Sequence, residues 1–268
     1  MNKKSVSKII PIIIAISLLQ ACSFFEEKIE YEPFVKALDE GDMRKVMSAS
    51  DDGYAYVKQR GIYSTYEQKE DGEHRKTIYQ TSEGIYNTKD KSLYGNTTQE
   101  VTSAVDSKDN KEEVVYRTNI MYKNGQVQSP ESNLDVSYVN LIVDRLKGIG
   151  KLKMKPGDDI KKFDQPSTVG YKLTELEFQS IINDKLKIQY DEYDEYDGGS
   201  IALHIDSKNG SKQILEVSIV INYKKRNDEG KLVKYISQIH TSFDSHQGNN
   251  QDAKQEYIDF KAKYNKTQ

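Results

Sequence analysis

The densest group of side chains that could do chemistry is an acidic cluster in the second half of the chain. Its members are Asp191, Glu192, Asp194, Glu195 and Asp197. Carboxylates this close together can bind a hard cation such as calcium, which takes about six to eight oxygen ligands. Their spacing does not match the ligand pattern of an EF-hand loop. We therefore interpret the cluster as a solvated acidic turn between a helix and a strand, and predict neither a metal site nor a cofactor.

The four histidines are the next candidates: His74, His204, His240 and His246. His204 and His240 could face each other on neighbouring strands as part of a metal site. No pair has the i, i+4 spacing of a helical metallohydrolase, however, and no cysteine is left to complete a zinc site. The chain also lacks a nucleophile elbow, a Walker loop and a dinucleotide fingerprint. We predict no catalytic residue and a protein that is not an enzyme.

The single cysteine, Cys22, follows a segment with the layout of a secretory signal. Lys3, Lys4 and Lys8 form a basic start, and the apolar run Ile9–Leu19 follows. This run is shorter than the roughly 20 apolar residues of a membrane-spanning helix. The alternatives are an uncleaved membrane helix or an ordinary signal followed by a chance cysteine.

The last four residues of this segment, Leu19-Gln20-Ala21-Cys22, resemble a bacterial lipobox. The resemblance implies cleavage before Cys22 and attachment of lipid to its sulfur, which leaves no free thiol. Two acyl chains anchor a protein stably, whereas one is marginal. We therefore predict a signal peptide at 1–21, an acidic tether at 22–32 and a single domain at 33–268. The expected location is the extracytoplasmic face of the cell membrane, with Cys22 as the lipid-attachment residue.

The charge balance bears on the partners of the chain. Removing residues 1–21 deletes three lysines and no acidic residue, which takes the formal net charge from -3 to -6. Binding of nucleic acid needs a basic surface, so this class of partner is excluded. Nineteen tyrosines and no tryptophan are typical of amphipathic strands.

Helical periodicity marks four segments of the mature chain. Around Gly41 the spacing predicts two short helices, the second capped by Asp42. Leu134, Tyr138, Leu141, Ile142 and Leu146 form a stripe that predicts a central helix ending at Gly148. Thr174-Glu175-Leu176-Glu177 is a capping box before a further helix, and residues 253–264 end the chain as a helix.

Elsewhere the period is two, which predicts strands. The runs are 54–66, 78–86, 92–101 and 113–122, then 201–205, 215–221 and 232–243. Short turns such as Asp71-Gly72 and Asn124-Gly125 separate them, so pairing is antiparallel. Strand runs segregated from helices indicate the α+β class. We predict a strongly curved antiparallel sheet, an open half-barrel, packed on the helices; the pattern leaves open whether both runs join in one sheet.

This layout resembles uncharacterised lipoproteins of Bacillus-type (Firmicutes) bacteria. The features that carry the resemblance are the lipobox, the helix pair, the meander, the central helix, a strand followed by Tyr171-Lys172-Leu173-Thr174-Glu175 and the final three strands. Those lipoproteins are similar in layout to the LolA/LppX superfamily of lipoprotein and lipid carriers. The likeness spans residues 30–245 and implies an incomplete barrel with an apolar cavity between sheet and helices.

Two functions follow from these observations. The first is a membrane-anchored extracytoplasmic lipoprotein that binds a lipid or other apolar ligand in the half-barrel. The side chains expected to line its cavity are Phe34, Leu38, Leu141, Ile142, Phe178, Ile182, Ile201, Leu203, Val217 and Ile219. The alternative is a module that binds or inhibits another envelope protein and takes no small ligand. Tyr, Gln and Thr at several inward positions make the expected cavity less apolar than that of a good lipid carrier.

Overall fold

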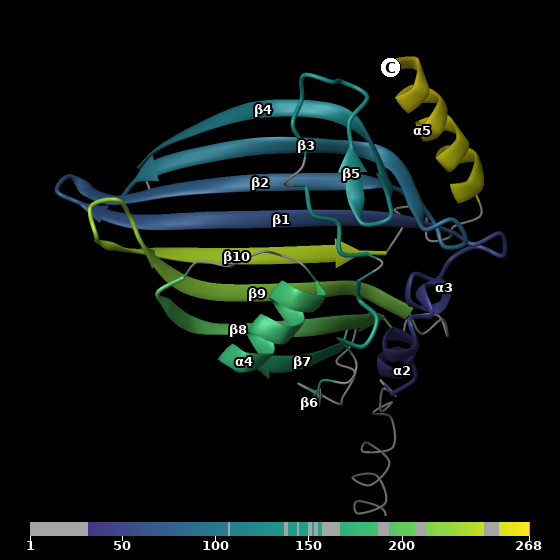
Figure 1. The fold of residues 1–268 in the computed structure, drawn as a ribbon, viewed down its shortest axis with the longest axis horizontal. Coiled ribbons are helices and arrows are strands. Elements are labelled where there is room, and N and C mark those ends of the chain that lie inside the picture. The colour runs from purple at the N-terminus through teal and green to yellow at the C-terminus, as the bar shows by residue number, and fades with distance from the viewer. Residues whose placement is uncertain are drawn as a thin grey trace, which may run out of the picture.

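A computed structural model describes most of the chain. The described residues are 32–106, 108–136, 139–143, 145–149, 152, 155–156, 167–186, 193–206, 213–243 and 252–267. They form a ten-stranded antiparallel sheet, curved and open, with short helices on both of its faces (Figure 1). The predicted curved antiparallel sheet packed on helices is confirmed. No described helix is long and apolar enough to cross a membrane.

The elements follow one another as two strand runs separated by helical and irregular segments. The helices are α2 (Glu32–Glu40), α3 (Met43–Val46), α4 (Glu175–Glu177), the π-helix η3 (Phe178–Lys185) and α5 (Ala253–Thr267). The first strands are β1 (Tyr54–Lys69), β2 (Gly72–Asn87), β3 (Ser92–Val105), β4 (Lys108–Lys123) and β5 (Gln126–Gln128). The later strands are β6 (Lys155–Pro156), β7 (Ser167–Leu173), β8 (Glu195–Asp206), β9 (Gln213–Arg226) and β10 (Leu232–Ser242).

Pairing between β1 and β10 joins the two runs into one sheet. The strand order is β5-β4-β3-β2-β1-β10-β9-β8-β7-β6. Strands β1 and β10 pair from Lys58 with Ser242 to Tyr66 with Lys234. The first and last described strands, β1 and β10, are thus in the middle of the sheet, while the short strands β5 and β6 lie at its two edges (Figure 1).

Alternation gives the sheet two different faces. On one face, here called the inner face, Ala55, Tyr86 and Tyr122 pack in the main hydrophobic cluster with residues of α2, α3 and η3. On the opposite, outer face, Tyr54 and Ile85 pack against α5. The main core therefore lies between the inner face and the N-terminal and central helical segments.

The C-terminal helix does not join this inner core. We expected all helical stripes to cover one face of the sheet, but Tyr257 and Tyr264 of α5 are buried on the outer face. The Tyr257 ring lies 5.2 Å from the rings of both Tyr54 and Tyr94. Its hydroxyl is 2.8 Å from Ser92 Oγ. The tyrosines that alternate outward on β1 and β3 provide α5 with an aromatic surface, and this places the helix.

The predicted helix across 134–146 is wrong. Among the described residues of this segment the backbone makes separate i to i+3 turns, such as Val139 N to Val136 O at 3.0 Å and Arg145 N to Ile142 O at 2.9 Å. The side chain of Gln59 takes the place of helical partners: its Nε2 donates to Asn140 O at 2.6 Å, and its Oε1 accepts from Ile142 N at 3.0 Å. Tyr138 of the predicted stripe lies outside the described residues.

The predicted helix caps agree with the structure. Asp42 caps α3 by accepting from Lys45 N at 3.1 Å. Thr174 and Glu177 form the predicted capping box of α4. Beyond it the chain continues as a π-helix, in which Leu186 N bonds to Ile181 O at 2.8 Å, five residues back. This wider turn still buries Phe178 and Ile182 against the inner face.

Candidate functional site

All ten residues expected to line a ligand cavity lie in the main hydrophobic cluster. They are Phe34, Leu38, Leu141, Ile142, Phe178, Ile182, Ile201, Leu203, Val217 and Ile219. Each is at most 3 % exposed. They come from α2, the irregular segment at 139–143, η3, β8 and β9, so the structure brings together every one of them. In this structure they pack against each other as core, and their role in holding a ligand stays a prediction.

A belt of buried polar side chains crosses the inner face beside this core. One row runs across Gln59, Ser82, Thr97 and Thr118 of adjacent strands, and Gln80 and Tyr116 lie in the next. Thr97 Oγ1 lies 2.7 Å from Ser82 Oγ and accepts from Gln80 Nε2 at 2.6 Å. Tyr116 donates to Gln80 Oε1 at 2.8 Å. These bonds satisfy groups whose burial would otherwise cost free energy.

Beyond the polar belt the inner face is hollow and open. A groove of about 850 Å³ lies at the ends of β1 to β4, away from α2 and α3. Its lining residues are Thr65, Glu67, Lys69, His74, Arg75, Lys76, Ser103, Ala104, Val105 and Lys111, here called the open groove. Four of these residues are lysine or arginine and one is acidic. The open groove is thus a basic site on a chain of negative net charge.

The turn between β1 and β2 shapes one end of the groove. Gly72 has φ +131, and a Cβ there would lie 2.5 Å from Asp106 Oδ2. Asp106 occupies this space because its Oδ1 accepts from Glu73 N at 2.9 Å. Glycine at position 72 therefore allows both the positive φ and the close approach of the β3–β4 turn, as expected for the Asp71-Gly72 turn.

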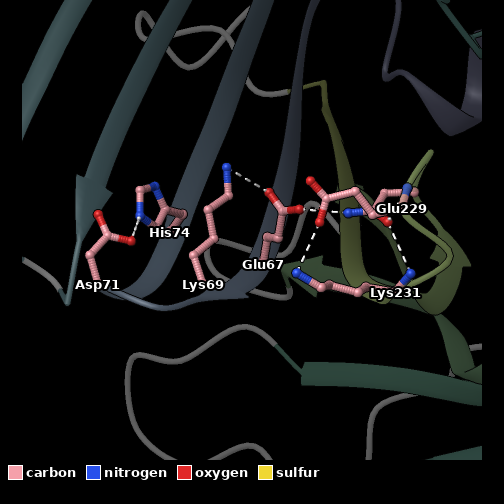
Figure 2. Close-up of polar contacts among 7 residues, drawn as sticks. Glu67, Lys69, Asp71, His74, Glu229 and Lys231 are labelled. Atoms are coloured by element: carbon pink, nitrogen blue, oxygen red, sulfur yellow. Dashed lines mark hydrogen bonds and ion pairs between the residues drawn. The ribbon is translucent and has the colours of Figure 1, made fainter.

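A polar network links this hairpin to the turn between β9 and β10 (Figure 2). Glu67 Oε2 is 3.1 Å from Lys69 Nζ, and Glu67 Oε1 accepts from Asn227 Nδ2 at 2.7 Å. These bonds, that from Lys69 first, lower the pKa of Glu67 below its usual value. The one carboxylate of the open groove therefore already has two donors within the protein.

Two further ion pairs lie at the ends of this network (Figure 2). His74 Nε2 is 2.7 Å from Asp71 Oδ1, and this hydrogen bond is the main cause of the lowered pKa of Asp71. Lys231 Nζ lies 2.9 Å from Glu229 Oε2, which raises the pKa of Lys231. Asp71, His74, Glu229 and Lys231 thus already have partners within the protein.

Tyrosines continue the inner face from the groove toward β8. Tyr235 pairs with Thr65 on one side and with Tyr223 on the other. The two rings stack at 5.1 Å and 6°. Burial raises the pKa of Tyr223 to about 12, and burial of the neighbouring Tyr63 has the same effect. These side chains form a half-buried aromatic surface between the hydrophobic core and the charged tip.

The acidic cluster is used in ion pairs where it is described. Asp194 accepts from Arg226 N at 2.6 Å, Glu195 lies 2.8 Å from Lys224 Nζ, and Asp197 lies 3.5 Å from the same ammonium. Asp191 and Glu192 lie outside the described residues. No group of three His, Cys, Asp or Glu suited to a metal occurs in the described part of the chain.

The structure does not bring His204 and His240 face to face on neighbouring strands, the alternative considered from the sequence. His204 and His240 are not on neighbouring strands, because β9 separates β8 from β10. Glu216 of β9 lies between them on the outer face, with Oε1 at 2.9 Å from His240 Nδ1 and 3.8 Å from His204 Nε2. The hydrogen bond to His240 is the main cause of the lowered pKa of Glu216. His246 lies outside the described residues.

The sequence did not predict the open groove. Lys76 and Lys111 fall outside the strands predicted over 78–86 and 113–122, whereas β2 begins at Gly72 and β4 at Lys108. A usable signal was present: along β2 the inward positions change from Tyr86 to Lys76 and His74, so the alternation continues while its inner side becomes charged. The strand pairing that brings Lys111 beside these residues is not visible locally.

The comparisons with known proteins identify no function. A family model described as a domain of unknown function, DUF3952, matches residues 17–117, a segment that ends within β4. No curated protein matches the chain.

Two solved structures are similar over much of the chain. One, titled "Lipid-protein interactions in lipovitellin", has a TM-score of 0.35 and 9% identity over 72% of this chain. The chain covers 25% of that protein. The other, an N-terminal dehydratase from the difficidin assembly line, has a TM-score of 0.14 and 11% identity, covering 80% of this chain and 86% of that one. Neither likeness is close enough to assign an activity.

Proposed function

We propose that the protein is a lipoprotein held at the extracytoplasmic face of the cell membrane by lipid on Cys22, and that it acts by binding a ligand in the open groove. The main observation in favour of this binding site is that the inner face of the sheet is divided into a filled half and a hollow half. Its half beside α2 and η3 is filled by side chains that are at most 3 % exposed, whereas the other half forms a hollow of about 850 Å³. Ligand sites are concave and mostly pre-formed.

The anchor is supported by the lipobox-like Leu19-Gln20-Ala21-Cys22 and by the basic and apolar segments before it. An anchored binding domain needs no catalytic centre, which is consistent with our prediction that the protein is not an enzyme. The relation to the LolA/LppX superfamily stays a prediction, and the open curved sheet with helices on its inner face is compatible with it.

Binding of a lipid or other apolar ligand between the sheet and the helices is the second candidate. The observation that favours it is the continuous apolar surface that α2 and η3 share with β8 and β9. Because these side chains are in contact, such a ligand can enter only if a helix moves away from the sheet. An interaction with another envelope protein would instead use the exposed groove or the tyrosine-rich outer face.

Fractionation of cells tests the anchor. Wild-type protein should sediment with the membrane, and Cys22→Ala should appear in the medium or remain unprocessed. Normal processing with unchanged membrane retention of Cys22→Ala would contradict lipid attachment.

Native mass spectrometry of protein purified from its own membrane tests the ligand class. A lipid that copurifies with the wild type and is lost in Phe178→Ala, which weakens the packing of η3 on the sheet, would favour the apolar site over the groove. A ligand retained by Phe178→Ala and lost on substitution of groove lysines supports the groove.

A further inference from the structure

The open groove contains an ordered row of polar side chains on four adjacent strands. Thr65 of β1 pairs with Lys76 of β2, Lys76 pairs with Ser103 of β3, and Ser103 pairs with Lys111 of β4. All four line the hollow. Directly paired residues point to the same face of a sheet. The row therefore alternates hydroxyl, ammonium, hydroxyl and ammonium groups across the floor of the groove.

The side chains that the structure describes do not neutralise the ammonium groups of this row. Within the described residues, no ion pair is formed by Lys76 or Lys111. Glu67, the acidic lining residue, is already bonded to Lys69 and Asn227. Glu113 follows Lys111 on the same side of β4, and its carboxylate is exposed. Counted over its described lining residues, the groove thus retains positive charge that solvent or a ligand must balance.

The spacing of the row suits an anion with several charged oxygens. Neighbouring strands lie about 4.8 Å apart, so the backbones of Lys76 and Lys111 are about 10 Å apart with Ser103 between them. A lysine carries its ammonium on a flexible four-carbon stem, so both groups can turn toward a ligand seated over Ser103. Lysine binds phosphate as a point charge, and hydroxyl groups donate to the remaining oxygens.

We propose that the open groove binds a phosphate-bearing group through Lys76 and Lys111, with Ser103 and Thr65 as hydroxyl donors. The volume of about 850 Å³ falls in the range of roughly 300–1,000 Å³ that small ligands occupy. This inference deepens the proposed function and rests on it for the location of the site. The phosphate belongs either to a lipid headgroup or to a free phosphate compound.

The test uses the full, lipidated protein in detergent with inorganic pyrophosphate as the probe, measured by calorimetric titration and by hydrogen exchange. Pyrophosphate should bind, should protect residues around Lys76 and Ser103, and should bind less tightly as salt is raised. The double variant K76Q/K111Q should weaken binding at least about tenfold, since each charged hydrogen bond is worth about that factor or more. The double variant K36Q/K45Q, on α2 and α3 and outside the open groove, is the matched control with the same loss of two charges and should change binding by less than about twofold.

Charge-conserving substitution separates recognition from folding. K76R/K111R should retain pyrophosphate binding while K76Q/K111Q loses it, and the melting temperatures of all variants should be similar because both lysines are exposed. Binding that is equal in K76Q/K111Q and wild type would overturn the inference, as would pyrophosphate protection confined to another face.

Vesicles distinguish the two sources of phosphate. In a flotation assay, preferential binding to phosphatidylglycerol over phosphatidylcholine vesicles, lost in K76Q/K111Q, assigns the groove to a headgroup. Pyrophosphate binding without vesicle preference assigns it to a free phosphate compound. If pyrophosphate fails but a copurified ligand without phosphate protects the groove, this inference falls and the proposed binding function stands. If no ligand protects the groove, both fall.

Discussion

The two halves of the inner face are made by the same strands and yet differ in burial and in charge. Near α2 the inward positions hold Ala55, Tyr86 and Leu93, which are buried in the main cluster. At the other end of the same strands they hold Thr65, Lys76 and Ser103, which line an open groove. The difference shows that the covered half supplies stability, while the open half is free to keep charged groups that a folded core could not hold.

The polar belt is the boundary between the halves. Its hydrogen bonds run both along the sheet and up to the irregular segment that covers it, as when Gln59 bonds to the backbone of Asn140 and Ile142. A second tie comes from Arg145, whose Nη1 donates to Leu186 O at 2.9 Å and whose Nη2 donates to Gly125 O at 2.7 Å. Directional bonds of this kind can end a hydrophobic core at a defined place, which non-directional packing does not do.

Truncation of one apolar side chain in each half should give the largest contrast. Leu203 is fully buried, so Leu203→Ala should lower the free energy of unfolding by about 3 kcal/mol, through lost burial and the cavity that remains. Val105 in the open groove is only half-buried, so Val105→Ala should cost less than about 1 kcal/mol. Urea unfolding measures both. Equal costs would mean that the open half is also packed in solution.

The next largest effect on stability is expected where the backbones of two strands approach closely in the covered half. Gly84 and Gly95 are paired on β2 and β3, and a Cβ on Gly95 would lie 2.0 Å from Glu83 O. Gly95→Ala should therefore force the strands apart and cost about 2–3 kcal/mol in urea unfolding. The control is Gly170→Ala, where the new Cβ meets only Ile201 O at 3.9 Å. A cost at Gly95 no larger than at Gly170 would contradict this close approach.

Loss of the polar belt should weaken the cover over the core. Gln59→Ala leaves Ile142 N and Asn140 O without their side-chain partner. We expect a cost of about 1–3 kcal/mol, because these groups lie in a largely buried segment. Gln68→Ala is the control, since Gln68 is exposed and donates to Lys69 O at 3.4 Å, a long bond at the surface. Hydrogen exchange should show faster exchange near Ile142 in the Gln59 variant alone; unchanged exchange there would argue against a role for Gln59 in holding the segment.

The smallest expected effect is a pH dependence of the free energy of unfolding. It comes from Glu216, which lies on the outer face of the sheet. The hydrogen bond with His240 lowers the pKa of Glu216 below its usual value in the folded protein. A carboxyl whose pKa is lower when folded stabilises the protein above its unfolded pKa, and this contribution is lost as the pH falls through the folded pKa. Glu216→Gln should thus cost less than about 1 kcal/mol at pH 7, since the side chain is 30% exposed.

At pH 3 the difference between Glu216→Gln and wild type should be smaller than at pH 7. Urea titrations at the two pH values measure it. Asp71→Asn in the open half is the comparison, because its carboxylate is 67% exposed and water screens its contact with His74. A difference for Glu216→Gln that grows toward pH 3 would show that the sign of the shift is wrong.

Local features of the fold followed from the sequence. The alternation from Tyr54 onward, the Asp71-Gly72 turn and the caps at Asp42 and Thr174 depend on residues within a few positions of each other, and the structure confirms them. The ten apolar residues expected to line a ligand cavity lie together in the main hydrophobic cluster, and their role in holding a ligand stays a prediction. Their grouping was predictable because period and burial are linked in both helices and strands.

The features that were predicted wrongly depend on residues far away in the chain. The segment 134–146 has a helical stripe, but Gln59, more than 80 residues before Ile142, binds its backbone in another conformation. The terminal helix α5 has an apolar side, and only the tyrosines of β1 and β3 decide which face of the sheet it covers. Hydrophobic periodicity indicates that a segment has an apolar side. It does not indicate which other segment packs against that side.

By itself, therefore, the sequence determined the period of each strand, the turns, the helix caps and the membership of the core, because each rests on neighbouring residues or on a composition that repeats. Only the tertiary structure decided that β1 pairs with β10 and that the inner face is covered over one half alone. It also brought Lys76 and Lys111 together across β3. Strand register joins residues about 35 positions apart, and no local pattern specifies it.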